Sequence, residues 1–419
     1  MYLNLFIDER AVTEEMTHSN NTRMTLNDIK KLTEENVLLT YGRRSLAFDT
    51  GEGVTLFDSE GNPYLDFAAG LGVNALGYAH PVVTDLIKRY AGNVLHTSNL
   101  YHISSQAILA KKLCNSSFGE RVFFCNSGTE AIEGALKCAR KWGNEFKPPK
   151  TNIVVFGNSF HGRTYGALSA TMQEKYRKGF GPFLPGFTQA IFNDTVSVDN
   201  AFTNETVAVL VEPVQGEGGV NVAREDFLRH IESLCRERDA LFIVDEVQCG
   251  MGRTGKLYAH EHFGVTPDIM TLAKPLAGGL PIGAVVTGPR VWPVIKPGDH
   301  ASTFGGNHFV TRVACGVFDI ISNSYFLDSI EKKGEYLMSL LMEVANKYSC
   351  IKEVRGKGLI VGVEVDFQAS DAVDYFEAHY ILICSAGPHV IRFIPPLIVT
   401  KDDIARVVST LDRFLAGRS

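Results

Sequence analysis

The feature that most constrains the fold is a long alternation of short apolar runs with helical patterns between Pro81 and Gly288. Short apolar runs separated by helices are typical of a mostly parallel sheet with helices on both faces. Ligands of such sheets bind at the carboxyl ends of the strands, so the residues after each run are the candidates for a site. The runs are Val122–Cys125, Ile153–Phe156, Val207–Glu212, Leu241–Val247, Ile269–Leu272 and Ala284–Thr287.

The residues before this alternation predict an arm and a small appended segment. Met1–Thr40 is polar and mixed in charge, with a weak helical pattern at Leu26–Leu39. A hairpin signal follows, in which Val54–Asp58 and Tyr64–Phe67 flank a Ser-Glu-Gly-Asn turn. We therefore expect residues 1–80 to form an N-terminal arm and a segment of a small domain.

The C-terminal part has a different pattern. From about Val310 a helical stretch is followed by strand-like Leu359–Val365 and Val390–Phe393, and then by a final helix. This order predicts a small α+β domain over 310–419, which leaves 81–309 as the large domain.

Composition excludes several classes of protein. The chain has 419 residues, of which 45% are hydrophobic and 21% charged, which is typical of a chain with a packed core. The net charge of −6 offers no basic surface for nucleic acid or an anionic membrane. No apolar run approaches the roughly 20 residues that span a bilayer, and the acidic N-terminus does not resemble a secretory leader. The eight cysteines are scattered without a C-x-x-C pair. We therefore expect a cytoplasmic protein with no metal site.

A candidate phosphate site follows the first apolar run. Ser127, Gly128 and Thr129 open a helical pattern and offer two hydroxyl groups and free backbone N–H groups, which hold phosphates at helix N-termini. Ser127 and Glu130 also have the spacing of a capping box. An ordinary capped helix is therefore the alternative interpretation.

Two charged residues follow other apolar runs. Asp245 ends Leu241–Val244, where a buried carboxylate needs a charged or hydrogen-bonding partner. Magnesium ligation and a helix cap are the alternatives for it. Lys274 follows Ile269–Ala273, where desolvation would lower its pKa and make it a nucleophilic amine suited to Schiff-base chemistry. The alternative is a surface lysine whose stem lies along apolar residues.

Asp245 and Lys274 are one strand-to-strand step apart, so we expect both at the same edge of the sheet. A carboxylate, an amine and a phosphate site at one edge match what pyridoxal phosphate requires. Gly250–Gly255 also fits the dinucleotide fingerprint G-x-G-x-x-G, but no amphipathic helix pattern follows it. A dehydrogenase is therefore the weaker interpretation.

Longer motifs resemble those of the class-III (subgroup II) pyridoxal-phosphate aminotransferases, and within that family the acetylornithine group. The similarity runs from about residue 41 to the C-terminus. It implies a fold-type I PLP-dependent transferase, with a mostly parallel seven-stranded sheet in a large PLP-binding domain and a smaller α+β domain. The matching segments include FFCNSGTEAIEGALKCAR, NSFHGRTYGALSAT, VEPVQGEGGV, LFIVDEVQCGMGRTG, PDIMTLAKPLAGGLPIGA and HASTFGGN.

For the cofactor, pyridoxal 5'-phosphate, the resemblance implies that Lys274 binds it covalently and Asp245 holds its pyridine nitrogen. Phe160 would stack on one face of the ring and Val247 would pack on the other. Gln248 would bond the phenolic oxygen. The residues implied to hold the phosphate are Ser127, Gly128, Thr129 and, from the other subunit of a homodimer, Thr303 with Ser302 beside it.

For the substrates, the resemblance implies that two guanidinium groups, Arg163 and Arg392, each bind a carboxylate. A structural ion pair is the alternative for either. Glu217 resembles the family's gate, which neutralises Arg392 while the amine donor is bound. Glu212 resembles another acid beside the pocket, and its alternative is a structural anchor.

The implied activity is transfer of the ω-amine of N-acetylornithine to 2-oxoglutarate. Other ω-amine donors, namely succinylornithine, ornithine, 4-aminobutyrate or a specialised metabolite, are the alternatives. The stretch 70–77 (GLGVNALG) resembles the acetylornithine group, whereas Tyr78 stands where the family usually has His. A mutase or decarboxylase of the same fold would not need the paired arginines and the gate. A binding protein with a decayed site is not expected to keep Lys274 and Asp245.

Overall fold

The structure is a computed structural model that describes residues 24–418. Among these, residues 24–51 and 56–64 form one compact unit, and 52–55 with 65–418 form the other. The first 23 residues of the predicted arm lie outside the described part of the chain. Over the described part, no helix is long and apolar enough to cross a membrane.

The first unit contains the predicted helix and most of the predicted hairpin. Helix α2 (Leu26–Asn36) begins at Thr25, whose hydroxyl group accepts from the backbone N–H of Asp28. The strands are β1 (Phe48–Glu52), β2 (Thr55–Asp58) and β3 (Pro63–Asp66). The turn after β2 is held by the Asp58 carboxylate, which accepts from the N–H groups of Glu60 and Asn62 at 2.9 and 2.8 Å.

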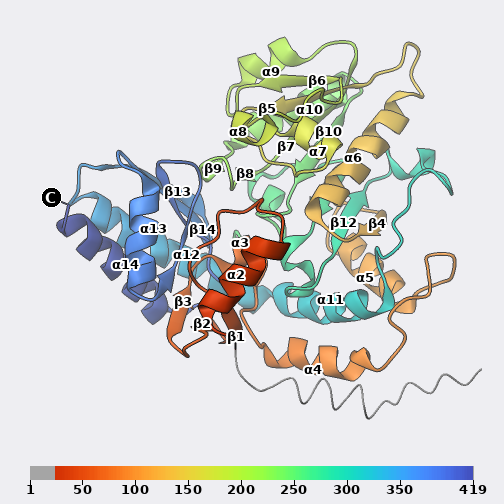
Figure 1. The fold of residues 1–419 in the computed structure, drawn as a ribbon. Helices are drawn as coiled ribbons and strands as arrows, with labels where there is room; N and C mark the ends of the chain where they lie inside the picture. Colours follow the sequence, from red (N-terminus) through yellow and green to blue (C-terminus); the bar gives the residue numbers. More distant parts are fainter. Residues whose placement is uncertain (1–23, 419) are drawn as a thin grey trace, which may run out of the picture. The chain divides into compact units, whose positions relative to one another are not determined.

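A seven-stranded sheet forms the centre of the second unit (Figure 1). Its strand order is β4-β12-β11-β10-β7-β5-β6, and β12 alone runs antiparallel to its neighbours, which confirms the mostly parallel sheet. Six of its strands coincide with the six predicted apolar runs, and β6 was not predicted. The strands are β4 (Arg121–Cys125), β5 (Asn152–Phe156), β6 (Phe187–Ala190), β7 (Thr206–Val211), β10 (Leu241–Asp245), β11 (Ile269–Leu272) and β12 (Gly283–Thr287).

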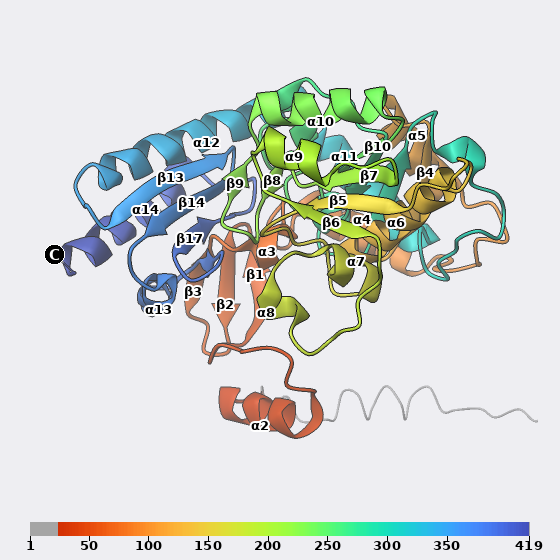
Figure 2. The same cartoon turned by 90° about the horizontal axis from the view of Figure 1, so that it is seen from above.

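Helices cover both faces of this sheet, as Figure 2 shows. Successive side chains of a strand point to opposite faces. In β10, Leu241 and Ile243 pack in one core cluster with α6 (Gly128–Gly143), while Phe242 and Val244 pack in another with α10 (Glu225–Glu237). Burial on both faces explains why the strands appear in the sequence as continuous apolar runs. The remaining elements around this sheet are α3 (Ala69–Gly72), α4 (Pro81–Ala91), α5 (Ser104–Asn115), α7 (Tyr165–Ala170), α8 (Glu174–Arg177), α9 (Thr195–Ala201), β8 (Val214–Gln215) and β9 (Asn221–Val222).

The C-terminal part is a second, smaller sheet covered by helices. Its strand order is β13-β14-β17-β16, and both strand-like segments predicted here are present as β14 and β17. The three-part division at residues 80 and 309 stays a prediction. The elements are α11 (His308–Ile321), α12 (Ser324–Ala345), β13 (Ile351–Lys357), β14 (Ile360–Val365), α13 (Ala369–Ala378), β15 (Ile381–Leu382), β16 (Cys384–Ser385), β17 (Val390–Phe393) and α14 (Lys401–Ala416).

Candidate active site

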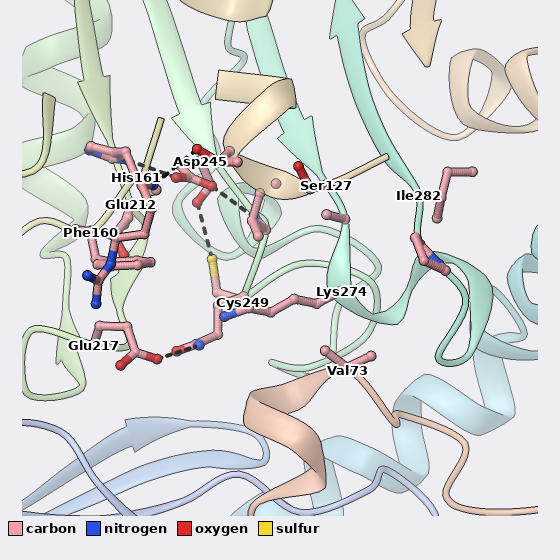
Figure 3. A pocket seen from close by; sticks show the side chains of 18 of the residues that line it. Val73, Ser127, Phe160, His161, Glu212, Glu217, Asp245, Cys249, Lys274 and Ile282 are labelled. Carbon is pink, nitrogen blue, oxygen red and sulfur yellow. Dashed lines mark hydrogen bonds and ion pairs between the residues drawn. The ribbon is translucent and has the colours of Figure 1, made fainter. Parts of the chain in front are cut away.

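A cleft of about 360 Å³ lies at the carboxyl ends of the central strands (Figure 3). The sequence named eleven of the residues that line it, and these come from six separate segments of the chain. They are Ser127, Gly128, Thr129, Phe160, Arg163, Glu212, Glu217, Asp245, Val247, Gln248 and Lys274.

Asp245 is held in the floor of the cleft by three donors. Its Oδ1 atom accepts from the Val247 N–H at 3.0 Å and from the Thr271 hydroxyl at 3.1 Å. Its Oδ2 atom lies 2.7 Å from Nδ1 of His161. Since an ionised carboxylate can only accept, the His161 proton is on Nδ1. The partner that a buried carboxylate requires is therefore a histidine.

Sequence reasoning did not name His161, although it directly follows Phe160 in the FHGR motif. That adjacency was the available signal. The ring is completely buried, and its Nε2 atom has no hydrogen-bond partner within residues 24–418. Over the same residues, no group of three or more His, Cys, Asp or Glu side chains is arranged to hold a metal ion.

Lys274 begins a short 3₁₀ helix directly after β11, and its side chain extends into the cleft (Figure 3). Within the described residues, its amine has no hydrogen-bond or ion-pair partner. Burial lowers the pKa of this amine, and the nearby carboxylate of Glu217 opposes that shift. The unpartnered, desolvated amine is suited to nucleophilic chemistry and lies inside the cleft rather than along the surface.

The N-terminus of α6 forms a cradle at one wall. Ser127 is the N-cap, and its hydroxyl accepts from the Glu130 N–H at 3.3 Å. Only half of the predicted capping box forms, because the Glu130 carboxylate accepts from the N–H of Asn126 instead. The N–H groups of the first helical turn, including those of Gly128 and Thr129, have no acceptor within the helix. Both the free donors and the helix dipole suit a phosphate.

Glu217 and Arg392 form the predicted pair at another wall. Arg392 Nη1 donates to Glu217 Oε1 at 2.7 Å and to Gln248 Oε1 at 3.1 Å. Burial alone would raise the pKa of Glu217, but the charges of Arg392 and Lys274 and two hydrogen bonds lower it to about 2. The pair is therefore ionised, with the carboxylate neutralising the guanidinium.

Glu212 fixes the loop that bears Phe160. Its Oε2 atom accepts from the Phe160 N–H at 3.0 Å. Burial, and then the charge of Asp245, raise the pKa of Glu212 well above its usual range. This contact matches the interpretation of Glu212 as a structural anchor, although the residue also lines the cleft.

Three predicted site residues lie outside the lining of the cleft: Ser302, Thr303 and Arg392. Arg392 still reaches the cleft through Glu217 and Gln248. The Ser302 hydroxyl accepts from the Asn126 side chain at 3.1 Å, whereas Thr303 is exposed. Their contribution to a second subunit's site stays a prediction.

The glycine-rich loop 250–255 does not form a dinucleotide site. Arg253 within it is completely buried and donates to the carbonyl groups of Leu359 and Pro395. Only a short 3₁₀ helix, Ala259–Phe263, follows, instead of the long helix that the fingerprint requires. The dehydrogenase interpretation is therefore wrong, because this loop packs against other parts of the chain.

The site fits pyridoxal phosphate on observations of the protein alone. An unpartnered buried amine, a carboxylate fixed by three donors and a helix end with free N–H groups line one cleft. Groups of these three kinds would hold the aldehyde carbon, the pyridine nitrogen and the phosphate of the cofactor.

The comparisons give the class of protein. Residues 40–415 match the family model of the class-III aminotransferases. The chain therefore belongs to this family of pyridoxal-phosphate enzymes, as the motifs indicated.

Within this family, the chain is similar to acetylornithine and ornithine aminotransferases. The acetylornithine aminotransferase of Caldanaerobacter subterraneus subsp. tengcongensis is 47% identical over 379 residues, covering 90% of this chain and 96% of the relative. The acetylornithine aminotransferase of Methanocaldococcus jannaschii is 45% identical over 376 residues, which cover 90% of this chain and 94% of the relative. Among solved structures, the ornithine aminotransferase of Toxoplasma gondii ME49 aligns with a TM-score of 0.91 at 33% identity, covering 97% of this chain and 98% of that one. The N-acetylornithine aminotransferase of Stenotrophomonas maltophilia K279a aligns with a TM-score of 0.81 at 34% identity, and the alignment covers 93% of this chain and 98% of that one.

Proposed function

We propose that this aminotransferase moves the ω-amino group of N-acetylornithine to 2-oxoglutarate, which gives N-acetylglutamate 5-semialdehyde and glutamate. The observation that supports an ω-amine donor most directly is the ionised Glu217–Arg392 pair beside Lys274. The name shared by the relatives at 42–47% identity supports the acetylated donor.

When bound, pyridoxal phosphate supplies an electron sink that acidifies the C–H bond next to the transferred nitrogen. The chain's own residues then handle the proton. Lys274 Nζ, desolvated and without a partner among the described residues, is the base for the proton on that carbon. Asp245, fixed by His161 and Thr271, presents its carboxylate in the floor of the cleft.

Glu217 and Arg392 let one site accept two different substrates. A donor that reaches Lys274 with its ω-amine has no carboxylate near Arg392, so Glu217 neutralises the guanidinium. 2-Oxoglutarate brings a carboxylate to that position, and Glu217 must move away for Arg392 to bind it. Arg163, at the rim of the cleft, binds the single carboxylate of the donor and the second carboxylate of 2-oxoglutarate.

The remaining expectations belong to the same proposal. A homodimer would bring Ser302 and Thr303 of one copy to the phosphate site of the other. The division into 1–80, 81–309 and 310–419 and the cytoplasmic location also stay predictions.

A panel of amine donors with 2-oxoglutarate tests the proposal. We expect the highest kcat/KM for N-acetylornithine, glutamate as a product, and no turnover by Lys274→Ala. Higher kcat/KM for 4-aminobutyrate would contradict the proposed donor. Higher kcat/KM for unacylated ornithine would favour the second candidate, ornithine aminotransfer, which the alignment with the Toxoplasma gondii enzyme supports.

A further inference from the structure

The guanidinium group of Arg163 donates no hydrogen bond to any residue in the described part of the chain. Arg163 is exposed at the rim of the cleft, and only its backbone N–H, which donates to the Thr129 hydroxyl at 3.1 Å, makes a hydrogen bond within residues 24–418. A long, unpaired side chain at a rim loses conformational entropy when it binds a ligand. Efficient binding of a carboxylate therefore requires a contact that fixes the Arg163 guanidinium and leaves its N–H groups free to donate to the ligand.

Aromatic rings provide that support. The Cζ atom of Arg163 lies 4.1 Å from the centre of the Tyr176 ring and 5.7 Å from that of Phe160. The two rings meet edge to face, with centres 5.2 Å apart and planes at 73°. A cation over a ring face is attracted by the ring quadrupole, and this contact leaves the N–H donors free.

Tyr176 is itself fixed in place by its short helix. Its backbone N–H donates to the carbonyl of Gln173 within residues 173–177. The Gln173 side-chain amide donates to the carbonyl groups of Asn158 and Ser159, which precede Phe160. The segment that supplies Tyr176 is therefore tied to the loop that supplies Phe160.

From this geometry we propose that Tyr176 is a positioning residue for the amine donor: its ring holds Arg163 so that the guanidinium edge faces the donor's carboxylate. The inference rests on the proposed function, because it assigns Arg163 to the donor. Tyr176 does not line the cleft and takes no part in proton transfer. Its effect is therefore on binding of the donor rather than on the chemical step.

The test is a double-mutant cycle measured with the cofactor bound. Tyr176→Leu should raise the donor KM about two- to fivefold, the effect of an exposed cation–π contact, with kcat and the visible absorption of the cofactor unchanged. Tyr176→Phe keeps the ring and should restore the wild-type KM. In an Arg163→Ala background, Tyr176→Leu should have no further effect.

Lys175 offers a matched control. Its Nζ atom lies 4.6 Å from the centre of the same Tyr176 ring, so Lys175→Met removes a neighbouring positive charge but leaves the ring. The inference predicts an unchanged donor KM for this variant. Three results would each overturn the inference. They are a donor KM that rises as much in Lys175→Met as in Tyr176→Leu, a donor KM that is as high in Tyr176→Phe as in Tyr176→Leu, and a full rise on adding Tyr176→Leu to Arg163→Ala. Failure of the proposed function is a separate result, because the wild-type protein would then prefer another donor in the donor panel. The double-mutant cycle would in that case be measured with the preferred donor.

Discussion

Nδ1 of His161 lies 2.7 Å from Oδ2 of Asp245, and both side chains are withdrawn from solvent. We expect His161→Ala to weaken cofactor binding, because it leaves a buried carboxylate short of one donor. Loss of a hydrogen bond to a charged group costs about 1.5–3 kcal/mol, which corresponds to roughly a 10- to 150-fold rise in Kd. Titration of the apoprotein with pyridoxal phosphate, followed by absorbance, measures this.

The exposed pair of His230 and Asp199 is the control for that variant, since it has the same 2.7 Å separation on the surface. His230→Ala should leave the Kd of the cofactor unchanged. Equal Kd values for the two variants would mean that the buried contact contributes nothing to cofactor binding.

Lys274 is the amine we expect to bond the cofactor. Borohydride reduction of the holoenzyme should attach the cofactor's mass to the peptide that contains Lys274, and Lys274→Ala should abolish both the modification and turnover. Lys333 is a half-buried lysine, with a pKa likewise lowered by burial, but its amine donates to the Leu397 carbonyl at 3.0 Å. Modification of the Lys333 peptide, or turnover by Lys274→Ala, would refute the assignment.

The strands and the charged residues that end them could be predicted because each leaves a local signal. β10 and β11 are buried on both faces and so appear as apolar runs that end at Asp245 and just before Lys274. β6 and β13 were not predicted, because both are partly exposed and contain polar residues. Their hydrophobicity alone does not separate them from loops.

Contacts between distant segments left no such signal. The sequence required a partner for Asp245 but could not show that the loop after β5 supplies it as His161, 84 residues away. Tyr176 lies on a four-residue helix, too short to produce a periodic pattern, so its contact with Arg163 depends on tertiary structure. Glu130 has capping-box spacing, yet its carboxylate binds the N–H of Asn126 because the chain before α6 turns toward it.

The pH dependence of stability should report the Glu217–Arg392 pair. The pKa of Glu217 is lowered from 4.5 to about 2, so the folded state favours the ionised form. The resulting stabilisation is fully present above pH 4.5 and is lost as the pH falls through about 2. We expect the free energy of unfolding of wild type to exceed that of Glu217→Gln by at most about 3 kcal/mol at pH 7, and the gap to close in that acidic window. Chemical denaturation over a pH series measures it.

An exposed carboxylate provides the comparison for Glu217. Glu225 pairs with Arg229 on the surface of α10, where ion pairs contribute little. Glu225→Gln should change the free energy of unfolding by less than about 0.5 kcal/mol at every pH. If the difference in free energy of unfolding between wild type and Glu217→Gln stays constant from pH 7 to pH 3, the pKa of Glu217 is not lowered.

Tyr78 should stabilise the turn segment next to the cleft. Its hydroxyl donates to Asp66 Oδ2 at 2.5 Å. Burial, and then the Asp66 charge, raise the pKa of Tyr78, so the phenol keeps its proton at neutral pH. We expect Tyr78→Phe to lower the free energy of unfolding by about 1.5–3 kcal/mol. Tyr325→Phe, at a side chain on the surface, is the control, and equal stabilities would disprove the role of the Tyr78 hydroxyl.

We expect that only glycine fits at position 128 in the phosphate cradle, because the Val247 side chain lies close to it and not because its backbone angles require glycine. A Cβ atom at this position would lie 2.6 Å from Cγ1 of Val247, which lines the same cleft. Gly128→Ala must therefore displace either the first turn of α6 or Val247, at a cost of about 1–3 kcal/mol. We expect the Kd of pyridoxal phosphate to rise by about 5- to 150-fold, because both displacements move groups that we assign to the cofactor. Gly92→Ala is the control, since a Cβ atom there would lie within 4 Å of no other described residue beyond its chain neighbours. If both alanine variants bind the cofactor as tightly as wild type, the close approach of α6 to Val247 is not needed for the cradle.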